Sequence, residues 1–470
     1  MNTIARLVVI ATLFHAFTMA KSNPVPSVNQ PLSPDAAKPG GPAFTLTVQG
    51  AGFVSKSMVQ WNGTARQTHF VNSTTLKAKI LISDIANAGT ASVTVSNPAP
   101  GGGVSDAQYF QIIKPAKSVS FKSSTLITGQ EPYQLASGDF NGDGKLDLAV
   151  ANVTGGTVSI MKGKGDGTFQ KQTQYPAGYG PIAVAVGDFN EDGKLDLVVV
   201  NNGNRSNGHP GTVTMLLGNG KGAFRKGKTF SCGTGPFFIV TGDFNRDGNL
   251  DVAVADYNVS FGNSVAVLLG KGDGTFQPYA AYNVGSAPIS LATEDLNGDG
   301  ILDLVTANEL SASVSVLLGN GDGTFQPHMD YQVVRNPISV AVGDLNGDKK
   351  PDLGVVSATD NTLSVLLGNG DGTFQPHADS PAGSAPVSIA IADFNADNRQ
   401  DIAIVNSTNP GAVSILLGKG DGTFKGPVSF PADVFPQGLA LGDFNGDGRL
   451  DLSTADVFSN LVSVMLQNGK

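Results

Sequence analysis

A nine-residue acidic motif occurs seven times in this chain and constrains its fold more than any other feature. The first copy, DFNGDGKLD, begins at Asp139. The later copies follow at spacings of 49, 55, 52, 49, 49 and 50 residues. A second motif of the form GxGDGTF alternates with the first. A period of about 50 residues predicts a repeat architecture in which each unit is one supersecondary structure.

Short apolar runs separate the two motifs, for example residues 182–186, 197–200 and 213–217. They are too short for helices and are bounded by Gly and Asn, so each is predicted to be a β-strand. Each unit then has four antiparallel strands, a to d, which is the pattern of a propeller blade. We therefore expect an all-β fold: a seven-bladed β-propeller preceded by a small immunoglobulin-like β-sandwich.

The two ends of the repeat region complement each other. The last unit has no strand d of its own, whereas residues 120–127 place an extra strand before the first strand a. We expect residues 120–127 to pair with residues 462–466, because this pairing closes the ring and removes two free sheet edges. An open or linear β array is the alternative.

The acidic loops have the composition of calcium sites. Short Asp and Asn side chains stand at positions 1, 3, 5 and 9, where their oxygens can converge on one ion. Position 7 would add its backbone carbonyl. The alternative is an acidic turn without metal. Up to seven Ca²⁺ ions are expected. The predicted ligands are Asp139, Asn141, Asp143, Lys145, Asp147; Asp188, Asn190, Asp192, Lys194, Asp196; Asp243, Asn245, Asp247, Asn249, Asp251; Asp295, Asn297, Asp299, Ile301, Asp303; Asp344, Asn346, Asp348, Lys350, Asp352; Asp393, Asn395, Asp397, Arg399, Asp401; and Asp443, Asn445, Asp447, Arg449, Asp451.

Both motifs together resemble the FG-GAP/VCBS repeat family, which includes the propellers of integrin α-chains. The resemblance covers residues 117–470 and implies a seven-bladed, calcium-stabilised extracellular propeller used for recognition or adhesion. Two loops depart from the pattern at position 6, where Lys349 and Asn398 replace glycine. Lysine tolerates the left-handed backbone conformation poorly, so the fifth loop is expected to be the weakest site.

The region before the repeats divides into three segments. Residues 1–20 combine a basic start with an apolar run, which predicts a secretory signal peptide rather than an uncleaved anchor. Residues 21–43 form a Pro-rich linker and the start of a sandwich. Residues 44–115 are predicted to form the sandwich itself. The pieces PGGPAFTLTVQGAGF, VQWNG and ASVTVSNPAPGG resemble an IPT/TIG immunoglobulin-like domain, and the resemblance covers residues 23–114. This resemblance implies a spacer or interaction module.

Composition excludes several classes of function. A net charge of −9 argues against nucleic-acid binding, and a single cysteine excludes an intrachain disulfide framework. The mature chain has no stretch long enough to span a membrane as an apolar helix. With the signal peptide, this predicts a secreted, extracellular or cell-surface location, with the periplasm as a variant.

The ligand-binding face is expected on the rim opposite the acidic loops. The connections b–c and d–a meet there, and two are long, residues 201–211 and 256–263. They carry Asn202, Arg205, His209, Tyr257 and Phe261, which we predict to contact an extracellular glycan or protein. GxSxG and HExxH motifs are absent, so no enzyme activity is expected. A polysaccharide lyase or hydrolase on a propeller scaffold and a purely structural surface spacer remain as alternatives.

Overall fold

The computed structural model describes residues 23–24, 26–28, 32–34, 36–99, 102–105, 108–203, 209–257 and 263–468. The predicted signal peptide, residues 1–20, lies outside this part of the chain. Within the described residues the one helical element is a 3₁₀ turn, η1 (Ile82–Ile85), and everything else regular is β-structure. None of the described helices is long and apolar enough to cross a membrane.

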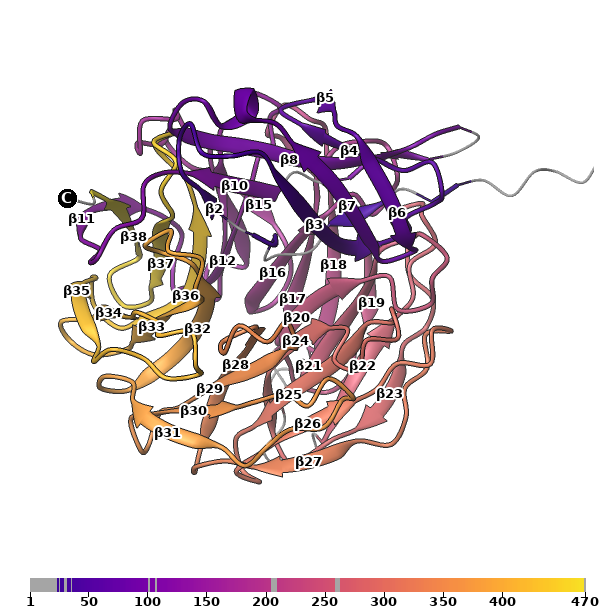
Figure 1. The fold of residues 1–470 in the computed structure, drawn as a ribbon. Coiled ribbons are helices and arrows are strands. Elements are labelled where there is room, and N and C mark those ends of the chain that lie inside the picture. Colours follow the sequence, from indigo (N-terminus) through magenta and orange to yellow (C-terminus); the bar gives the residue numbers. More distant parts are fainter. Residues whose placement is uncertain are drawn as a thin grey trace, which may run out of the picture.

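Residues 121–467 form seven antiparallel four-stranded sheets (Figure 1). In order of pairing, six of them are β12 (Pro132–Gly138), β13 (Asp147–Asn152), β14 (Thr157–Met161), β15 (Thr173–Pro176); β16 (Pro181–Gly187), β17 (Asp196–Asn201), β18 (Thr212–Gly218), β19 (Phe224–Ser231); β20 (Pro236–Gly242), β21 (Asp251–Asp256), β22 (Ser264–Leu268), β23 (Ala280–Asn283); β24 (Pro288–Glu294), β25 (Asp303–Asn308), β26 (Ser313–Leu317), β27 (Met329–Gln332); β28 (Pro337–Gly343), β29 (Asp352–Ser357), β30 (Thr362–Leu366), β31 (Ala378–Pro381); and β32 (Pro386–Ala392), β33 (Asp401–Asn406), β34 (Ala412–Leu416), β35 (Val428–Pro431).

The seventh sheet combines both ends of the repeat region. Its order is β11 (Phe121–Ile127), β38 (Leu461–Gln467), β37 (Asp451–Asp456) and β36 (Pro436–Gly442). β11 and β38 are antiparallel, and their register runs from Phe121 opposite Gln467 to Ile127 opposite Leu461. The pairing expected between residues 120–127 and 462–466 is therefore present.

Burial explains the arrangement of the four strands in each sheet. Every residue of the second strand is buried in all seven sheets, as in β13 and β17. Such strands read as continuous apolar runs because neighbouring sheets cover both of their faces. Each first strand begins with a proline. The first residue of a strand is a position that tolerates a missing N–H. Consecutive first strands contact one another around the molecule, and β12 also contacts β36.

Adjacent sheets are joined by a repeated contact between the two sequence motifs. Phe140, at position 2 of the first acidic loop, packs edge-on against Phe224 of the next sheet, with ring centroids 5.6 Å apart. The N–H of Gly222 donates to the carbonyl of Phe140 over 2.8 Å. Equivalent Gly-to-carbonyl bonds join five further pairs of sheets, including Gly167 to Phe444 between the first and last sheets.

The seventh junction lacks the second motif and uses a side chain instead. Gln467 takes the position that Gly163 has in the first sheet. Its side-chain Nε2 donates to the carbonyl of Phe394 over 2.7 Å. Its backbone N–H donates to Asp451 Oδ1 over 2.7 Å. One glutamine therefore supplies both contacts that the GxGDGTF turn supplies in the other sheets.

The sandwich precedes the repeats and consists of two sheets. One has the order β1 (Ser27–Val28), β3 (Phe44–Ala51), β7 (Thr75–Ile80), β6 (Thr68–Asn72). The other has β2 (Ala36–Ala37), β10 (Gln108–Ile112), β8 (Gly89–Asn97), β4 (Met58–Trp61), β5 (Thr64–Ala65), with β9 (Gly103–Val104) beside β8. β1 and β2 show that the sandwich starts within residues 21–43.

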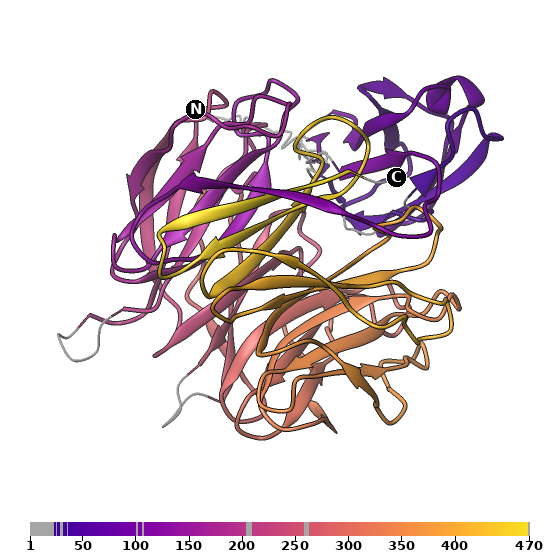
Figure 2. The same cartoon turned by 90° about the vertical axis from the view of Figure 1, so that its left-hand side faces the viewer.

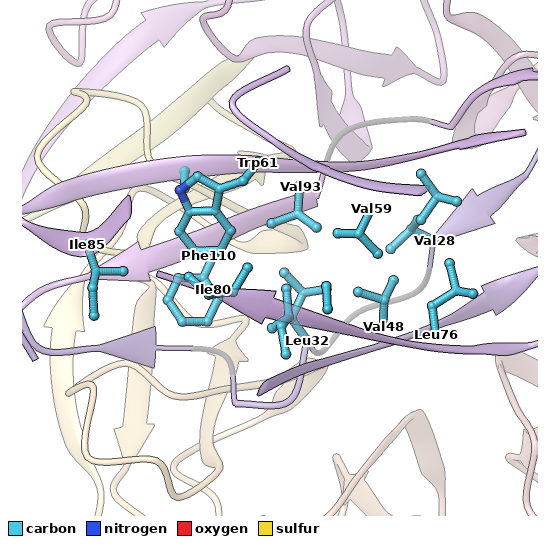
Figure 3. Close-up of a cluster of buried hydrophobic side chains, with 14 of the residues drawn as sticks. Val28, Leu32, Val48, Val59, Trp61, Leu76, Ile80, Ile85, Val93 and Phe110 are labelled. Atoms are coloured by element: carbon cyan, nitrogen blue, oxygen red, sulfur yellow. The ribbon is translucent and has the colours of Figure 1, made fainter. Parts of the chain in front are cut away.

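Trp61 lies in the core between these two sheets, as its position in an apolar strand indicates (Figure 3). It is 1% exposed, and its ring centroid is 5.1 Å from that of Phe110. Leu32 and Ile80 complete this part of the cluster. Burial of these side chains gives the sandwich a hydrophobic core separate from those of the repeated sheets.

The sandwich lies against the rim that carries the acidic loops (Figures 1 and 2). Gln111 Nε2 donates to the carbonyl of Asp393 over 2.9 Å, and the N–H of Ala116 donates to the carbonyl of Asn395 over 2.8 Å. The Thr90 hydroxyl donates to the carboxylate of Asp443. These contacts of the sandwich all lie on the rim of the acidic loops.

The β11–β38 pairing predicts unequal effects of two N-terminal deletions. Deleting residues 1–116 removes the sandwich and leaves all seven sheets four-stranded. Deleting residues 1–128 also removes β11, which exposes the edge of β38 and favours pairing between molecules. We expect the longer deletion to melt at a lower temperature and to aggregate, measured by calorimetry and light scattering. Equal melting temperatures and equal solubility would contradict a stabilising role for β11.

Candidate functional site

Each acidic loop joins the first two strands of a sheet and folds around the carboxylate at position 1. In the first loop the N–H of Gly144 donates to Asp139 Oδ2 over 2.7 Å, and the N–H of Gly142 donates to Oδ1 over 2.8 Å. At position 5, Asp143 Oδ1 accepts the N–H of Lys145 over 3.0 Å. Backbone donors therefore hold the acidic side chains inside the curl of the loop.

The Asp at position 9 connects two turns of its sheet. Asp147 Oδ2 accepts the N–H of Phe140 over 3.1 Å, and Oδ1 accepts the N–H of Gly163 over 2.8 Å. Gly163 has no space for a side chain, since a Cβ there would lie 2.1 Å from the carbonyl oxygen of Leu146. Matching bonds occur in the other six sheets at Asp196, Asp251, Asp303, Asp352, Asp401 and Asp451.

Burial makes these seven carboxylates unusually weak acids. Each is 0% exposed. Burial raises their pKa above the ordinary 3.8, and the carboxylates at positions 1 and 5 raise it further: to about 6 for Asp147, about 7 for Asp303 and about 8 for Asp251. Of the loop carboxylates described, those forming ion pairs are at position 5, as in Lys194 to Asp192 at 2.9 Å. Among the described residues, no ion pair with a lysine or arginine involves a carboxylate at position 9.

The donors in these loops are oxygens of the kind that calcium binds. In the described residues, however, no three Asp, Glu, His or Cys side chains are close enough together to hold a metal ion. The reason is visible at position 9, where both carboxylate oxygens face backbone N–H groups. The composition and charge of the loops suit a divalent cation. In the observed structure, however, the carboxylate oxygens accept hydrogen bonds from the backbone N–H groups of the loop itself.

The backbone of the loops explains their glycines. Position 6 has positive φ throughout, including Lys349 at 67° and Asn398 at 62°. Position 4 also has positive φ, although Glu191, Arg246 and Ala396 occupy it in three copies. The sequence analysis overlooked position 4. Glycine in the other four copies is the signal that marks it.

A second group of side chains surrounds the interior at the opposite rim. Tyr133 and Phe237 are the second residues of β12 and β20, and their rings meet edge-on with centroids 5.5 Å apart. The sheet of β16 lies between theirs in the chain, so this contact spans the space enclosed by the first strands. Tyr257 packs against Phe237 at 5.3 Å. Together these rings form an aromatic surface at the axis.

Glu309 lies beside this aromatic surface. Its Oε1 accepts Nδ2 of Asn336 over 2.7 Å, whereas its buried Oε2 has no hydrogen bond of ordinary geometry among the described residues. Burial raises the pKa of Tyr257, and a hydrogen bond with the neighbouring Glu309 carboxylate and the charge of that carboxylate raise it further. Burial and Glu309 also raise the pKa of Tyr133 to about 12. Both phenols are thus neutral at physiological pH, and Tyr257 lies within hydrogen-bonding reach of the Glu309 carboxylate.

We refer to Tyr133, Phe237, Tyr257 and Glu309 as the axial cluster. Tyr257 was predicted from the sequence, and the other three were not. For Glu309 the aligned repeats contain a signal, because the residue after the second strand differs from sheet to sheet: Val153, Asn202, Tyr257, Glu309, Ala358, Ser407 or Val457.

The remaining predicted contact residues are only partly brought together. His209 stacks on Tyr179 with centroids 3.6 Å apart, and Tyr179 is 57% exposed. Asn202 donates to the carbonyl of Pro236 over 2.9 Å, which places it near the axial cluster. Arg205 and Phe261 lie outside the described residues.

Comparison with family models identifies the repeats and the sandwich. A model described as an FG-GAP-like repeat matches residues 139–199, 192–254, 243–306, 295–355, 354–404 and 393–453. A model of the IPT/TIG domain matches residues 28–112. No curated protein matches the chain.

Similar solved structures are distant. A periplasmic gluconolactonase from Pseudomonas aeruginosa is 15% identical with a TM-score of 0.49, covering 75% of this chain and 94% of its own. A Lactobacillus plantarum protein has 15% identity and a TM-score of 0.49, with 74% and 95% covered. An auxiliary nutrient binding protein from Bacteroides ovatus has 12% identity and a TM-score of 0.43, with 94% and 98% covered.

The raised pKa values at position 9 predict the pH dependence of stability without divalent cations. Between the ordinary value of 3.8 and the folded values of about 6 to 8, the folded chain holds more protons than the unfolded chain. Stability is therefore greatest near pH 4 and is lost as pH rises through 6 to 8. Exposed carboxylates such as Asp322, whose pKa is lowered by its hydrogen bonds with Thr324, act in the opposite direction but only below pH 3.8.

Urea unfolding of chelator-treated protein between pH 4.5 and 7.5 measures this effect. We expect the midpoint to fall steadily with rising pH at constant m-value. A midpoint that rises over this range would show that the position 9 carboxylates ionise freely in the folded chain.

Proposed function

Because the chain belongs to the FG-GAP-like repeat family, we propose that it is a secreted or cell-surface, calcium-stabilised propeller that recognises a glycan at its axis. The seven sheets are its blades. The contact of β12 with β36 and the pairing of β11 with β38 support a closed ring of seven. Closure leaves no long free edge, so the scaffold can present a rigid binding rim.

Calcium in this proposal occupies the acidic loops through the oxygens at positions 1, 3, 5 and 9 and the carbonyl at position 7. The uncompensated carboxylates support it, because a divalent cation offsets the charge that burial concentrates there. A bound ion supplies fixed positive charge and adds no catalytic step. The five residues of each loop would hold the ion, and the backbone N–H groups would orient their carboxylates.

Recognition is assigned to the axial cluster, and the observation that carries it is the Glu309 carboxylate beside three aromatic rings. A sugar ring has apolar C–H faces and hydroxyl edges. Aromatic side chains cover the former, and a carboxylate accepts hydrogen bonds from the latter. A hydrogen bond from a ligand hydroxyl to a carboxylate is worth about 1.5–3 kcal/mol.

The same cluster also raises the second candidate, a glycan lyase or hydrolase. A carboxylate next to a tyrosine hydroxyl is a pair that proton-transfer chemistry uses. The raised pKa of Tyr257 and Tyr133 opposes this reading, since a base must lose its proton near neutral pH. Binding without turnover is therefore the preferred function, and chain shortening of a bound polysaccharide would favour the enzyme.

Calcium binding predicts a large change in thermal stability. A ligand that binds only the folded chain stabilises it by about 2.7 kcal/mol per site at 100 times its Kd. We expect a higher melting temperature in millimolar calcium than in EDTA, with magnesium less effective. Lys349→Gly relieves a left-handed lysine and should tighten the fifth site by about 1 kcal/mol.

Asn398→Gly is the matched control, because Asn already tolerates the same conformation and its gain should be smaller. Calorimetric titration compares the two variants. Identical melting curves with and without calcium would remove the calcium proposal. If both substitutions changed calcium affinity equally, backbone strain at Lys349 would not be the cause.

Glycan recognition predicts a selective loss of binding on substitution in the axial cluster. A glycan array in millimolar calcium identifies a ligand, and titration then gives its Kd. Glu309→Gln keeps the shape but removes the charge, so affinity should fall at least about tenfold, as for one charged hydrogen bond. The affinity of the Tyr257→Phe variant for the glycan should fall less. Asp360→Asn, on the same rim but paired with Arg335, should leave the Kd unchanged. Undiminished binding by Glu309→Gln would place recognition elsewhere.

A further inference from the structure

A cavity of about 540 Å³ lies between the sandwich and the propeller. One of its walls is formed by β8 and β10 of the sandwich, and the other by first strands and acidic loops of four sheets. It is therefore at the opposite end of the axis from the axial cluster. Pockets of this size at domain interfaces commonly bind small molecules.

The sandwich wall is polar. Ser92 and Thr94 of β8 and Gln108 and Gln111 of β10 line the cavity. Gln111 is 4% exposed, and its Nε2 donates to the carbonyl of Asp393 over 2.9 Å. Its Oε1 is buried and has no hydrogen-bond partner among the described residues. The wall thus contains an acceptor that lacks a donor.

The propeller wall is apolar. Leu146, Leu195, Leu441 and Leu450 line it, and they come from three sheets. Among the described residues that line the cavity there is no lysine, arginine or histidine, and the one carboxylate is that of Asp139. The N–H groups of its own loop already hold this carboxylate. The described walls therefore offer no free counter-charge to an anion or a cation, which favours a neutral ligand.

The two walls of the cavity differ in polarity, so they offer both hydrogen-bonding groups and apolar surface to a ligand. An amphipathic molecule satisfies both walls, with a hydroxyl toward Gln111 and an apolar part on the leucines.

We propose that this cavity is a second binding site, for a neutral amphipathic glycoside of monosaccharide size whose hydroxyl donates to Gln111 Oε1. The ligand bridges the sandwich and the propeller, so binding it also holds the two domains together. This site is independent of the glycan site at the axial cluster, from which it differs in charge and in place.

Hexyl β-D-glucopyranoside, below its micellar concentration, and hexanol are suitable probes for titration calorimetry on the full-length protein. We expect saturable glucoside binding and at least tenfold weaker hexanol binding. Thr94→Trp fills the cavity and should weaken glucoside binding at least tenfold. Ser96→Trp places the same side chain two residues further along β8, outside the lining, and should keep wild-type affinity. Gln111→Leu removes the acceptor and should also weaken binding tenfold or more.

Circular dichroism and melting curves establish that each variant is folded. Wild-type affinity in folded Thr94→Trp would overturn the proposal, as would the absence of saturable glucoside binding to the wild type. Hexanol binding as tight as glucoside binding would show an apolar pocket in which Gln111 has no role. Loss of binding in Glu309→Gln but not in Thr94→Trp would assign the glucoside to the axial cluster and likewise overturn the proposal.

Discussion

The buried aspartate at position 9 is the interaction on which the repeat depends. Its two oxygens accept N–H groups from two different turns of the same sheet, and it does so in all seven sheets. Hydrogen bonds from the backbone to a buried carboxylate are strong because water does not compete with them. They stabilise the sheet only while both N–H donors stay in place. The acidic loop therefore needs a second N–H donor, which the glycine turn supplies in six sheets and Gln467 supplies in the seventh. The same burial raises the pKa of these carboxylates, so the groups that connect the turns are also the ones whose ionisation costs most.

This constraint divides the molecule into a uniform rim and a variable rim. Turns on the first rim are tied to each other by Asp147 and its equivalents and to the next sheet by bonds such as Gly222 to Phe140. Little can change there, and the sandwich docks against this regular surface. Connections on the second rim are free of those bonds. Residues such as Tyr257 and Glu309 can vary there without loosening the sheets, which is where a repeat protein can acquire specificity.

The repeated four-stranded sheets could be predicted from the sequence because their signals are local. Apolar runs, prolines and glycines lie within a few residues of the structure they specify, and the mismatch between the chain ends indicated the partner of β11. Contacts made between distant residues were not predictable in this way. Asp147 as a tie to Gly163, Gln467 in place of a glycine turn, and Tyr133 facing Phe237 all require knowledge of which sheets lie side by side. Docking of the sandwich through Gln111 depends on surface complementarity, for which the strand pattern contains no signal.

The sheet that contains β11 and β38 is assembled from residues far apart in the chain; Ser120 and Asn468, 348 residues apart, are joined by a hydrogen bond. At roughly 5–20 residues per second of synthesis, β11 leaves the ribosome about 17–70 seconds before its partner exists. Sheets in the middle of the repeat region can form from neighbouring residues during that time. The last sheet cannot, and its non-local pairing is expected to be the slow step of folding. A protein built this way is complete only when its final strand has been made, so a prematurely terminated chain keeps an exposed edge that quality-control proteases can recognise.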